Sequence, residues 1–362
     1  METIGFDIAI FGSDPLALLS AGLLAERHGR KVCLVARPFA LGQLPRGIDI
    51  SVSPATRPAL WHLASRLVPE TRALIEGIGG ASVASVASEP ILVGSAPATL
   101  EALQHMRHVA MGTGVRVTRV ADADIGEGSV GYRFNGAWQL DRARLMPILL
   151  GWLDTLGVYQ TGLVTTPATL RRDGSVRLAL DDRTIVADRA AFLDAEAVAT
   201  HLPAAARDPI LQLDPRRGIL TEPARPLASS TMLYLDRGAT LSQSADGSIT
   251  ALLRGNADTA FARLGACLAA QGPLRRAAEA RIVVVDCSDG APLVGTVRGS
   301  RARIVAGLGP WSAFFSPAIV RWIEGSTGSE EADSLASLGS QRVALRPTLA
   351  DFSAPRCLAG AS

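Results

Sequence analysis

The start of the chain alternates between strand-like and helix-like apolar runs. Residues 6–11 are almost continuously apolar, which is typical of a buried strand, and a helix-compatible stretch runs from Leu16 to about His28. Gly29 ends that stretch, and residues 31–35 predict a second strand. Because a strand, a helix and a strand follow one another so closely, we predict a βαβ unit within a parallel sheet.

Similar patterns recur later in the chain. Residues 138–158 carry leucines at helical spacing and predict an amphipathic helix, while 304–325 read as a strand, a Gly-x-Gly turn and a helix. Residues 232–235 and 248–253 predict two strands joined by a turn at Asp246 and Gly247. The prolines of 203–230 predict no regular element there.

These elements predict an α/β fold built from two interleaved parts. One is a Rossmann-like domain, in which helices cover a central, mostly parallel sheet, and the other is a smaller α+β domain with an antiparallel sheet. The predicted division is discontinuous: 1–75, 138–203 and 280–345 form the first domain, 76–137 and 204–279 form the second, and 346–362 form a C-terminal tail.

Composition narrows the class of protein. Apolar residues make up 48% of the chain and charged residues 19%, so we expect a globular protein. A net charge of +2 without a long basic run argues against a nucleic-acid partner. Cys33 and Cys287 lie in apolar runs that favour buried reduced thiols, and the cysteines show no metal-ligand spacing. His105 and His108 are three positions apart but have no carboxylate partner at ligand spacing, so we expect no metal site. Because we find neither a secretion signal nor a long apolar run, we expect a cytoplasmic protein without a transmembrane segment.

The first strand-to-helix turn departs from the dinucleotide-binding motif. That motif places glycine at three positions, for a tight turn, for close approach to a pyrophosphate and for helix packing. Those positions hold Gly12, Asp14 and Ala17. Asp14 is either an N-cap ahead of Pro15 or a charge that excludes phosphate. Two like charges about 4 Å apart repel by about 4 kcal/mol at an effective dielectric constant near 20. The N–H groups of Gly12 and Ser13 remain candidates for a phosphate.

A second glycine turn lies near the end of the chain. Gly307 and Gly309 stand between a predicted strand and a predicted helix. A helix N-terminus carries unsatisfied N–H groups and favours anions. We therefore predict that the two turns converge on one elongated anionic ligand.

Four stretches carry a family resemblance. They are FDIAIFGSDPLALLSAGLLAERHGRKVCLVAR, WQLDRARLMPILLGWLDTLGV, DGAPLVGTVRG with IVAGLGPWSAFFSPAIVRWIEG, and the tail DFSAPR. In order and spacing the chain resembles the D-amino-acid oxidase, glycine oxidase and sarcosine oxidase group of flavoproteins. The resemblance implies FAD as the cofactor and oxidation of a C–N bond of an amine or amino acid.

The departures from that family gather at the cofactor. Asp14 replaces the middle glycine, and Ala36 with Arg37 stands where an acidic residue would bind ribose. Asp194-Ala195 and Ser312 depart at two further positions. Two hypotheses therefore stay open. The protein is a FAD-dependent oxidoreductase, or it is a catalytically silent relative that acts as a binding or structural subunit of a larger complex, with a partner protein in place of a substrate.

The resemblance also implies site residues. Arg254 and Tyr234 lie on strands of the expected substrate sheet, and Arg298 is the preferred arginine for a substrate carboxylate. Trp311 lies either beside the flavin ring or in the core. Arg37 and Arg46 bind cofactor phosphate or ribose, or are solvated cations. The full cofactor set is Gly12, Ser13, Asp14, Ala17, Arg37, Arg46, Val164, Gly307, Gly309, Trp311 and Ser312.

Overall fold

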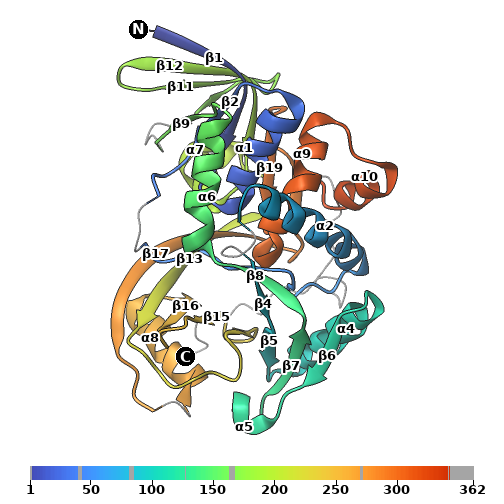
Figure 1. Ribbon diagram of the computed structural model, residues 1–362, viewed down its shortest axis with the longest axis vertical. Helices are drawn as coiled ribbons and strands as arrows, with labels where there is room; N and C mark the ends of the chain where they lie inside the picture. Colours follow the sequence, from blue (N-terminus) through green and yellow to red (C-terminus); the bar gives the residue numbers. More distant parts are fainter. Residues whose placement is uncertain are drawn as a thin grey trace.

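The computed structural model describes residues 2–39, 43–80, 85–126, 128–162, 168–269, 272–340 and 342. Two large β-sheets dominate these residues, one at the top of Figure 1 and one in its lower half. A short three-stranded sheet lies with them. Val164 falls outside the described residues.

The first sheet confirms the predicted parallel core. Its strand order is β10 (Thr169–Leu170), β11 (Val176–Ala179), β12 (Arg183–Phe192), β1 (Glu2–Phe11), β2 (Val32–Val35) and β9 (Tyr159–Thr161). Strand β12 also pairs with β19 (Arg303–Ala306), which in turn pairs with β18 (Leu293–Thr296). β1 runs parallel to both β2 and β12. The carboxyl ends of these strands therefore lie at one edge, where dinucleotide folds bind their ligands.

Helices cover this sheet. They are α1 (Pro15–His28), α2 (Pro58–Gly77), α6 (Arg142–Thr155), α7 (Ala195–His201), α9 (Ser316–Glu324) and α10 (Ser329–Ala336). Helix α1 is buried along most of its length and packs against α6 and α9. A Cβ at Gly22 would lie 2.1 Å from the ring of Trp152, so glycine allows the close contact of α1 and α6. Asp141 caps α6, because its side chain accepts the N–H of Arg144.

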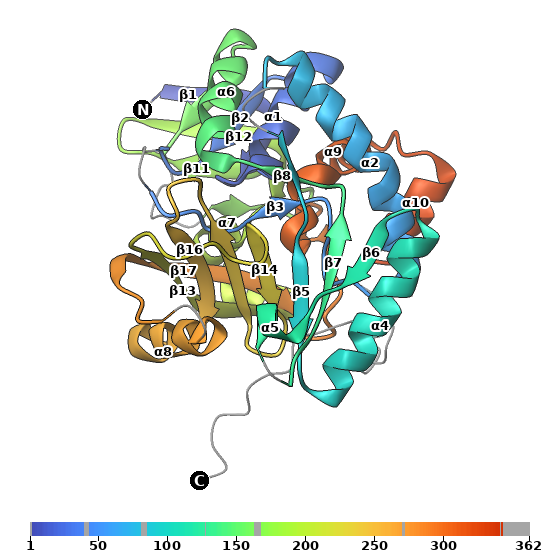
Figure 2. The ribbon, with the colours of Figure 1, turned by 60° about the horizontal axis from the view of Figure 1, so that its bottom comes forward.

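The second sheet is mostly antiparallel. Its order is β17 (Arg276–Cys287), β13 (Leu211–Thr221), β16 (Ile249–Arg254), β15 (Ala239–Gln243), β14 (Thr231–Tyr234), β5 (Ile91–Gly94), β7 (Val130–Asn135) and β6 (Arg116–Arg119) (Figure 2). Its helices are α4 (Pro97–Gly112), α5 (Asp122–Ile125) and α8 (Ala257–Cys267). The α/β class with a second, antiparallel sheet is thus confirmed. The division into domains stays a prediction, and β17 crosses its boundary at residue 280.

Two sequence expectations fail in this sheet. Residues 203–230 contain the long strand β13, with Pro215 inside it. Pro215 is in register only with Val283 of β17, and pairing with β16 begins one residue later. The missing N–H of proline therefore does not interrupt a central ladder. In addition, β15 lies between β14 and β16, so these two strands are not joined by the turn at Asp246 and Gly247 alone.

The short sheet and two 3₁₀ turns position the site. The sheet consists of β3 (Asp49–Ile50), β8 (Ala137–Leu140) and β4 (Ser85–Ser88). Since Asp49 pairs with Leu140, β3 lies beside the start of α6. The C-terminal glycine turn continues into η3 (Gly309–Trp311) and η4 (Ala313–Phe315); a further 3₁₀ turn, η1 (Ala204–Ala206), lies elsewhere.

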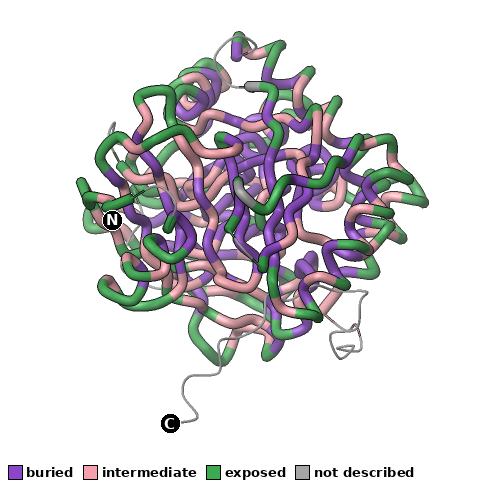
Figure 3. The backbone as a smooth tube through the Cα atoms, turned by 90° about the horizontal axis from the view of Figure 1, so that it is seen from below, coloured by how far each residue is buried: buried purple, intermediate pink, exposed green. Residues whose placement is uncertain are grey.

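Buried backbone fills the middle of the molecule in Figure 3. Trp311 belongs to this core, because its side chain is 1% exposed and packs edge-on against Trp61 and stacked on Phe315. Cys33 and Cys287 are buried free thiols, as predicted, and burial raises the pKa of each to about 12.

Candidate functional site

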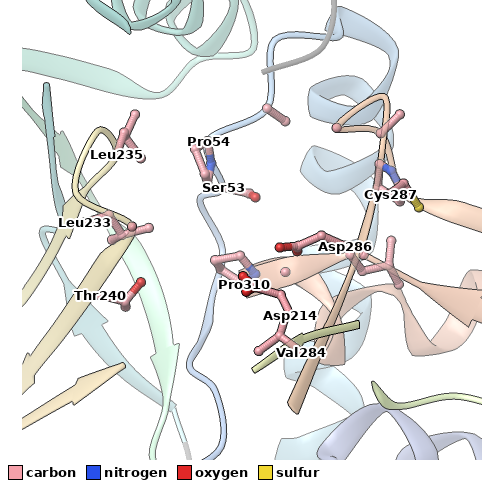
Figure 4. A pocket seen from close by; sticks show the side chains of 18 of the residues that line it. Ser53, Pro54, Asp214, Leu233, Leu235, Thr240, Val284, Asp286, Cys287 and Pro310 are labelled. Atoms are coloured by element: carbon pink, nitrogen blue, oxygen red, sulfur yellow. The ribbon is translucent and has the colours of Figure 1, made fainter. Parts of the chain in front are cut away.

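A cavity of about 540 Å³ separates the second sheet from the C-terminal glycine turn. Figure 4 shows Leu233 and Thr240 on one side of it and Asp214 and Asp286 on the other. Leu308 and Pro310 contribute to its lining from the glycine turn. This volume is typical of a site for a small molecule.

Two arginines and two aspartates form a cluster in the cavity wall. Arg216 donates through Nε to Asp214 at 3.1 Å and through Nη2 to Asp286 at 2.8 Å. Arg254 makes the same pair of contacts, at 2.7 Å and 3.1 Å. All four side chains line the cavity and are partly exposed. The cluster consists of Asp214, Arg216, Arg254 and Asp286, and we call it the Arg–Asp cluster.

The Arg–Asp cluster has unused hydrogen-bonding capacity. Only one oxygen of each aspartate, Oδ2, accepts the bonds above, and neither guanidinium uses Nη1 within the described part of the chain. The cluster as a whole is neutral. It can therefore offer two donors to an anionic group and two acceptors to a cationic group without losing its internal pairs.

A second, smaller cavity of about 180 Å³ adjoins the first. It is lined by Asp14 of the N-terminal turn and by Gly307 and Gly309 of the C-terminal turn. Arg216 and Asp286 line both cavities. The two turns therefore border one cavity, while their binding of a single anionic ligand stays a prediction.

Asp14 makes an ion pair at this convergence. It occupies the N-cap position of α1, which is one of the two alternatives left by the sequence, but its side chain makes no capping hydrogen bond. Its Oδ1 instead accepts from Nη1 of Arg142 at 3.0 Å, and Nε of Arg142 donates to the fully buried Asp49 at 2.6 Å. Burial on its own lowers the pKa of Arg142, but Asp49 and Asp14 together raise it above the usual arginine value. Ser312 completes the network by donating to Asp49 at 3.0 Å.

A second carboxylate accepts the Ser13 N–H of the turn, while the Gly12 N–H donates to the carbonyl oxygen of Val35. Asp194 caps α7 through the N–H of Ala197 at 2.7 Å, and it also accepts the N–H of Ser13. Burial, and then the negative charge of Asp14, raise the pKa of Asp194 to about 6. Gly12 allows this approach, since a Cβ there would lie 3.3 Å from the Asp194 carboxylate and 2.7 Å from Cβ of Ala17.

Glu196 binds both arginines that the sequence assigns to the cofactor. Arg37 and Arg46 each form an ion pair with its carboxylate. The backbone N–H of Arg37 also donates to Oγ of Ser13 at 2.8 Å. Burial and the neighbouring Arg37 lower the pKa of Arg46. The structure thus brings the two arginines together, with an acidic side chain between them.

The three residues that the sequence assigns to the substrate lie in different places. Arg254 reaches the cavity as part of the Arg–Asp cluster. Tyr234 borders the cavity, but its hydroxyl donates to the carbonyl oxygen of Cys267 at 3.1 Å, and burial raises its pKa to about 12. Arg298 lies exposed in the turn between β18 and β19, outside the lining of both cavities, because its backbone is tied to Ala206.

Several residues of the site are absent from the sequence prediction. They are Asp49, Arg142, Glu196, Asp214, Arg216 and Asp286. The sequence places Arg142 at the start of a predicted helix, but it does not show which carboxylates this side chain binds. Asp214 and Arg216 were not predicted as site residues because the prolines around them argued against a strand. Successive side chains of a strand point to opposite faces, so the order Asp214, Pro215, Arg216 in a strand places both charged side chains on the same face of the sheet.

Comparisons with known proteins support the fold. No protein-family model and no curated protein sequence matches the chain. Among solved structures, it is similar to the glycine oxidase from Geobacillus kaustophilus, with a TM-score of 0.71, 14% identity, and coverage of 91% of this chain and 98% of that one. It is also similar to the amino acid oxidase NikD, with a TM-score of 0.73, 13% identity, and coverage of 92% of this chain and 97% of that one. For L-proline dehydrogenase from P. horikoshii the TM-score is 0.69 and the identity 12%, with coverage of 91% of this chain and 96% of that one. The chain therefore has the fold of the FAD-dependent amino acid oxidases. Within its described part, no helix is long and apolar enough to span a membrane.

The residues at the N-terminal turn do not fit FAD. In dinucleotide folds a doubly charged pyrophosphate lies against the bare backbone of this turn. The Ser13 N–H is already bound to Asp194, and Arg142, Arg37 and Arg46 are paired with carboxylates. The hydrogen bond from Ser312 to Asp49 also joins the C-terminal turn to β3. No reaction step is therefore assigned to a flavin.

Proposed function

We propose that this protein binds a small molecule that carries both an ammonium group and a carboxylate, such as an amino acid, in the 540 Å³ cavity. The Arg–Asp cluster is the observation that supports this function. A carboxylate of the ligand would accept from Nη1 of Arg216 or Arg254, and its ammonium group would donate to Oδ1 of Asp214 or Asp286. Both contacts are charge-assisted and therefore stronger than neutral hydrogen bonds.

The rest of the cavity is consistent with such a ligand. Leucines on both of its sides, Leu233 and Leu308 among them, provide an apolar surface for a short side chain. The proteins of similar fold include an oxidase of glycine and a dehydrogenase of L-proline. A ligand of this class would leave the internal ion pairs of the cluster intact, so its binding requires no rearrangement of charge.

Calorimetric titration of the full chain with glycine, L-proline and iminodiacetate tests the proposal. Propionate and ethylamine serve as half-ligands, each with one charged group only. We expect one of the amino-acid probes to bind, and the half-ligands to bind roughly ten- to a hundredfold more weakly, because each lacks a set of charge-assisted bonds. Equal binding of both half-ligands, or no binding of any probe, would refute the proposal.

A matched pair of variants locates the site. Arg216→Met removes a cavity arginine, and we expect it to abolish binding. Arg217→Met changes the next residue of β13, which instead pairs with Glu279 at 3.1 Å, and we expect it to bind as the unaltered chain does. Loss of binding in both variants would indicate damage to the sheet rather than to a ligand contact.

The FAD-dependent oxidoreductase predicted from the sequence is the second candidate. It is favoured by the fold and by the convergence of the two glycine turns. A purified protein with flavin absorption bands in stoichiometric amount, together with turnover of an amine or amino acid, would establish it. A colourless protein that takes up no added FAD would exclude it and leave the binding function.

A further inference from the structure

The N-terminal glycine turn is connected to its surroundings by side chains of the protein itself. Arg142 bridges Asp14 and Asp49, and Ser312 extends this chain of contacts to the C-terminal turn. Four segments far apart in the sequence are joined in this way: the β1–α1 turn, β3, the start of α6 and the end of η3. Gly47 permits the arrangement, because a Cβ there would lie 3.1 Å from Nη2 of Arg142.

The charges around the turn are opposite to those an anionic ligand needs. The set comprises four carboxylates and three guanidinium groups: Asp14, Asp49, Asp194 and Glu196, with Arg37, Arg46 and Arg142. One negative charge is in excess when Asp194 is ionised. A pyrophosphate would add two more negative charges to this set, in which every guanidinium group already pairs with a carboxylate.

We propose that the Asp14–Arg142–Asp49 network takes the structural place of an anionic cofactor, and that the folded protein excludes FAD. The network connects the two glycine turns through side chains of the protein, without a ligand between them. The folded state is therefore complete without a ligand at this turn. This inference is independent of the binding of a zwitterion in the larger cavity.

FAD titration tests the exclusion. The full-length protein is purified, its visible spectrum is recorded, and its unfolding temperature is measured with and without excess FAD. We expect no flavin bands and no change in temperature, since a ligand that does not bind the folded state cannot stabilise it. Co-purified flavin, or a rise in unfolding temperature with FAD, would overturn the proposal. Calorimetry with amino-acid probes is a separate measurement, so the two failures are distinguishable.

Two variants of α6 test the structural role. Arg142→Met leaves two carboxylates without their cation, one of them fully buried, and we expect the unfolding equilibrium constant to rise by roughly a hundredfold or more. Arg144→Met is the control, since this side chain is 65% exposed and pairs with Asp141 on the surface. An equal change of the unfolding equilibrium constant in the two variants would contradict a structural role for the network.

Asp14→Asn provides the measurement if Arg142→Met does not accumulate. The Asp14 side chain is 30% exposed, so its change to an amide is a mild perturbation. It removes the excess negative charge while keeping the shape of the turn. We expect a loss of stability smaller than that of Arg142→Met, because Asp49 keeps its partner. A stability equal to or above that of the unaltered chain would show that the Asp14–Arg142 pair holds nothing together.

Discussion

Replacement of Asp194 by asparagine should change how stability depends on pH. In the folded protein the pKa of Asp194 is raised from 3.8 to about 6, first by burial and second by Asp14. The backbone N–H groups of Ala197 and Ser13 and the charge of Arg46 act in the opposite direction but do not cancel this. Between these two pH values the folded chain retains a proton that the unfolded chain has lost.

The sign follows from linkage. Where the folded state binds more protons than the unfolded state, the free energy of unfolding decreases as pH rises. The contribution of Asp194 is therefore fully present below 3.8 and is lost as pH rises through about 6. The difference between the two pKa values corresponds to a contribution of about 3 kcal/mol to the free energy of unfolding, at about 1.36 kcal/mol for each pKa unit.

Urea unfolding of the unaltered chain and of Asp194→Asn, at intervals between about pH 4 and pH 7, measures this contribution. Because the variant cannot titrate at this position, the difference between the two free energies reports Asp194 together with its interaction with Asp14. We expect the unaltered chain to lose about 2 kcal/mol relative to the variant over the range, because part of the contribution is already lost at about pH 4. Asp173→Asn is the control, since hydrogen bonds from Ser175 lower the pKa of Asp173, so this group titrates below the range and its difference should stay nearly flat. A flat or rising difference for Asp194 would refute the reasoning.

Two further predictions concern packing and burial. Gly22→Ala should destabilise the chain by about 1–3 kcal/mol, because its methyl group would overlap the Trp152 ring. Gly151→Ala is the matched control, since no atom lies within 4 Å of the added Cβ, and it should raise the free energy of unfolding by up to about 1 kcal/mol. Thermal unfolding of both variants checks this, and equal effects would contradict it. Arg342→Met should lose about 3–5 kcal/mol in urea unfolding, because Asp289, with a side chain only 2% exposed, would lose its partner. A loss below about 1 kcal/mol would place this pair among ordinary surface ion pairs.

The sequence predicted the elements of the parallel sheet because their signals are local. An apolar run, a glycine and a helix-compatible stretch specify the β1–α1–β2 unit without reference to the rest of the chain. The second sheet was predicted less completely. Pro215 argued against a strand, and only the register with β16 and β17 shows why proline is tolerated at that position.

The chemistry of the turn could be predicted only in part. The sequence shows that a charge stands at Asp14, and it leaves two explanations, a cap or the exclusion of phosphate. It cannot show that Arg142 neutralises the charge, because the two residues are 128 positions apart. Pairings across such distances depend on the folded arrangement. For the same reason the sequence could not show that Arg37 and Arg46 meet at Glu196.

The two cavities differ in their balance of charge. Around the smaller one, four carboxylates face three guanidinium groups, so an anionic ligand there meets an excess of negative charge. In the larger one, the Arg–Asp cluster keeps Nη1 and Oδ1 atoms free within the described residues while its charges are balanced. Binding there forms hydrogen bonds without breaking any. A ligand of this protein should therefore be recognised in the larger cavity, beneath the antiparallel sheet, and not at the turn where dinucleotide folds hold their phosphates.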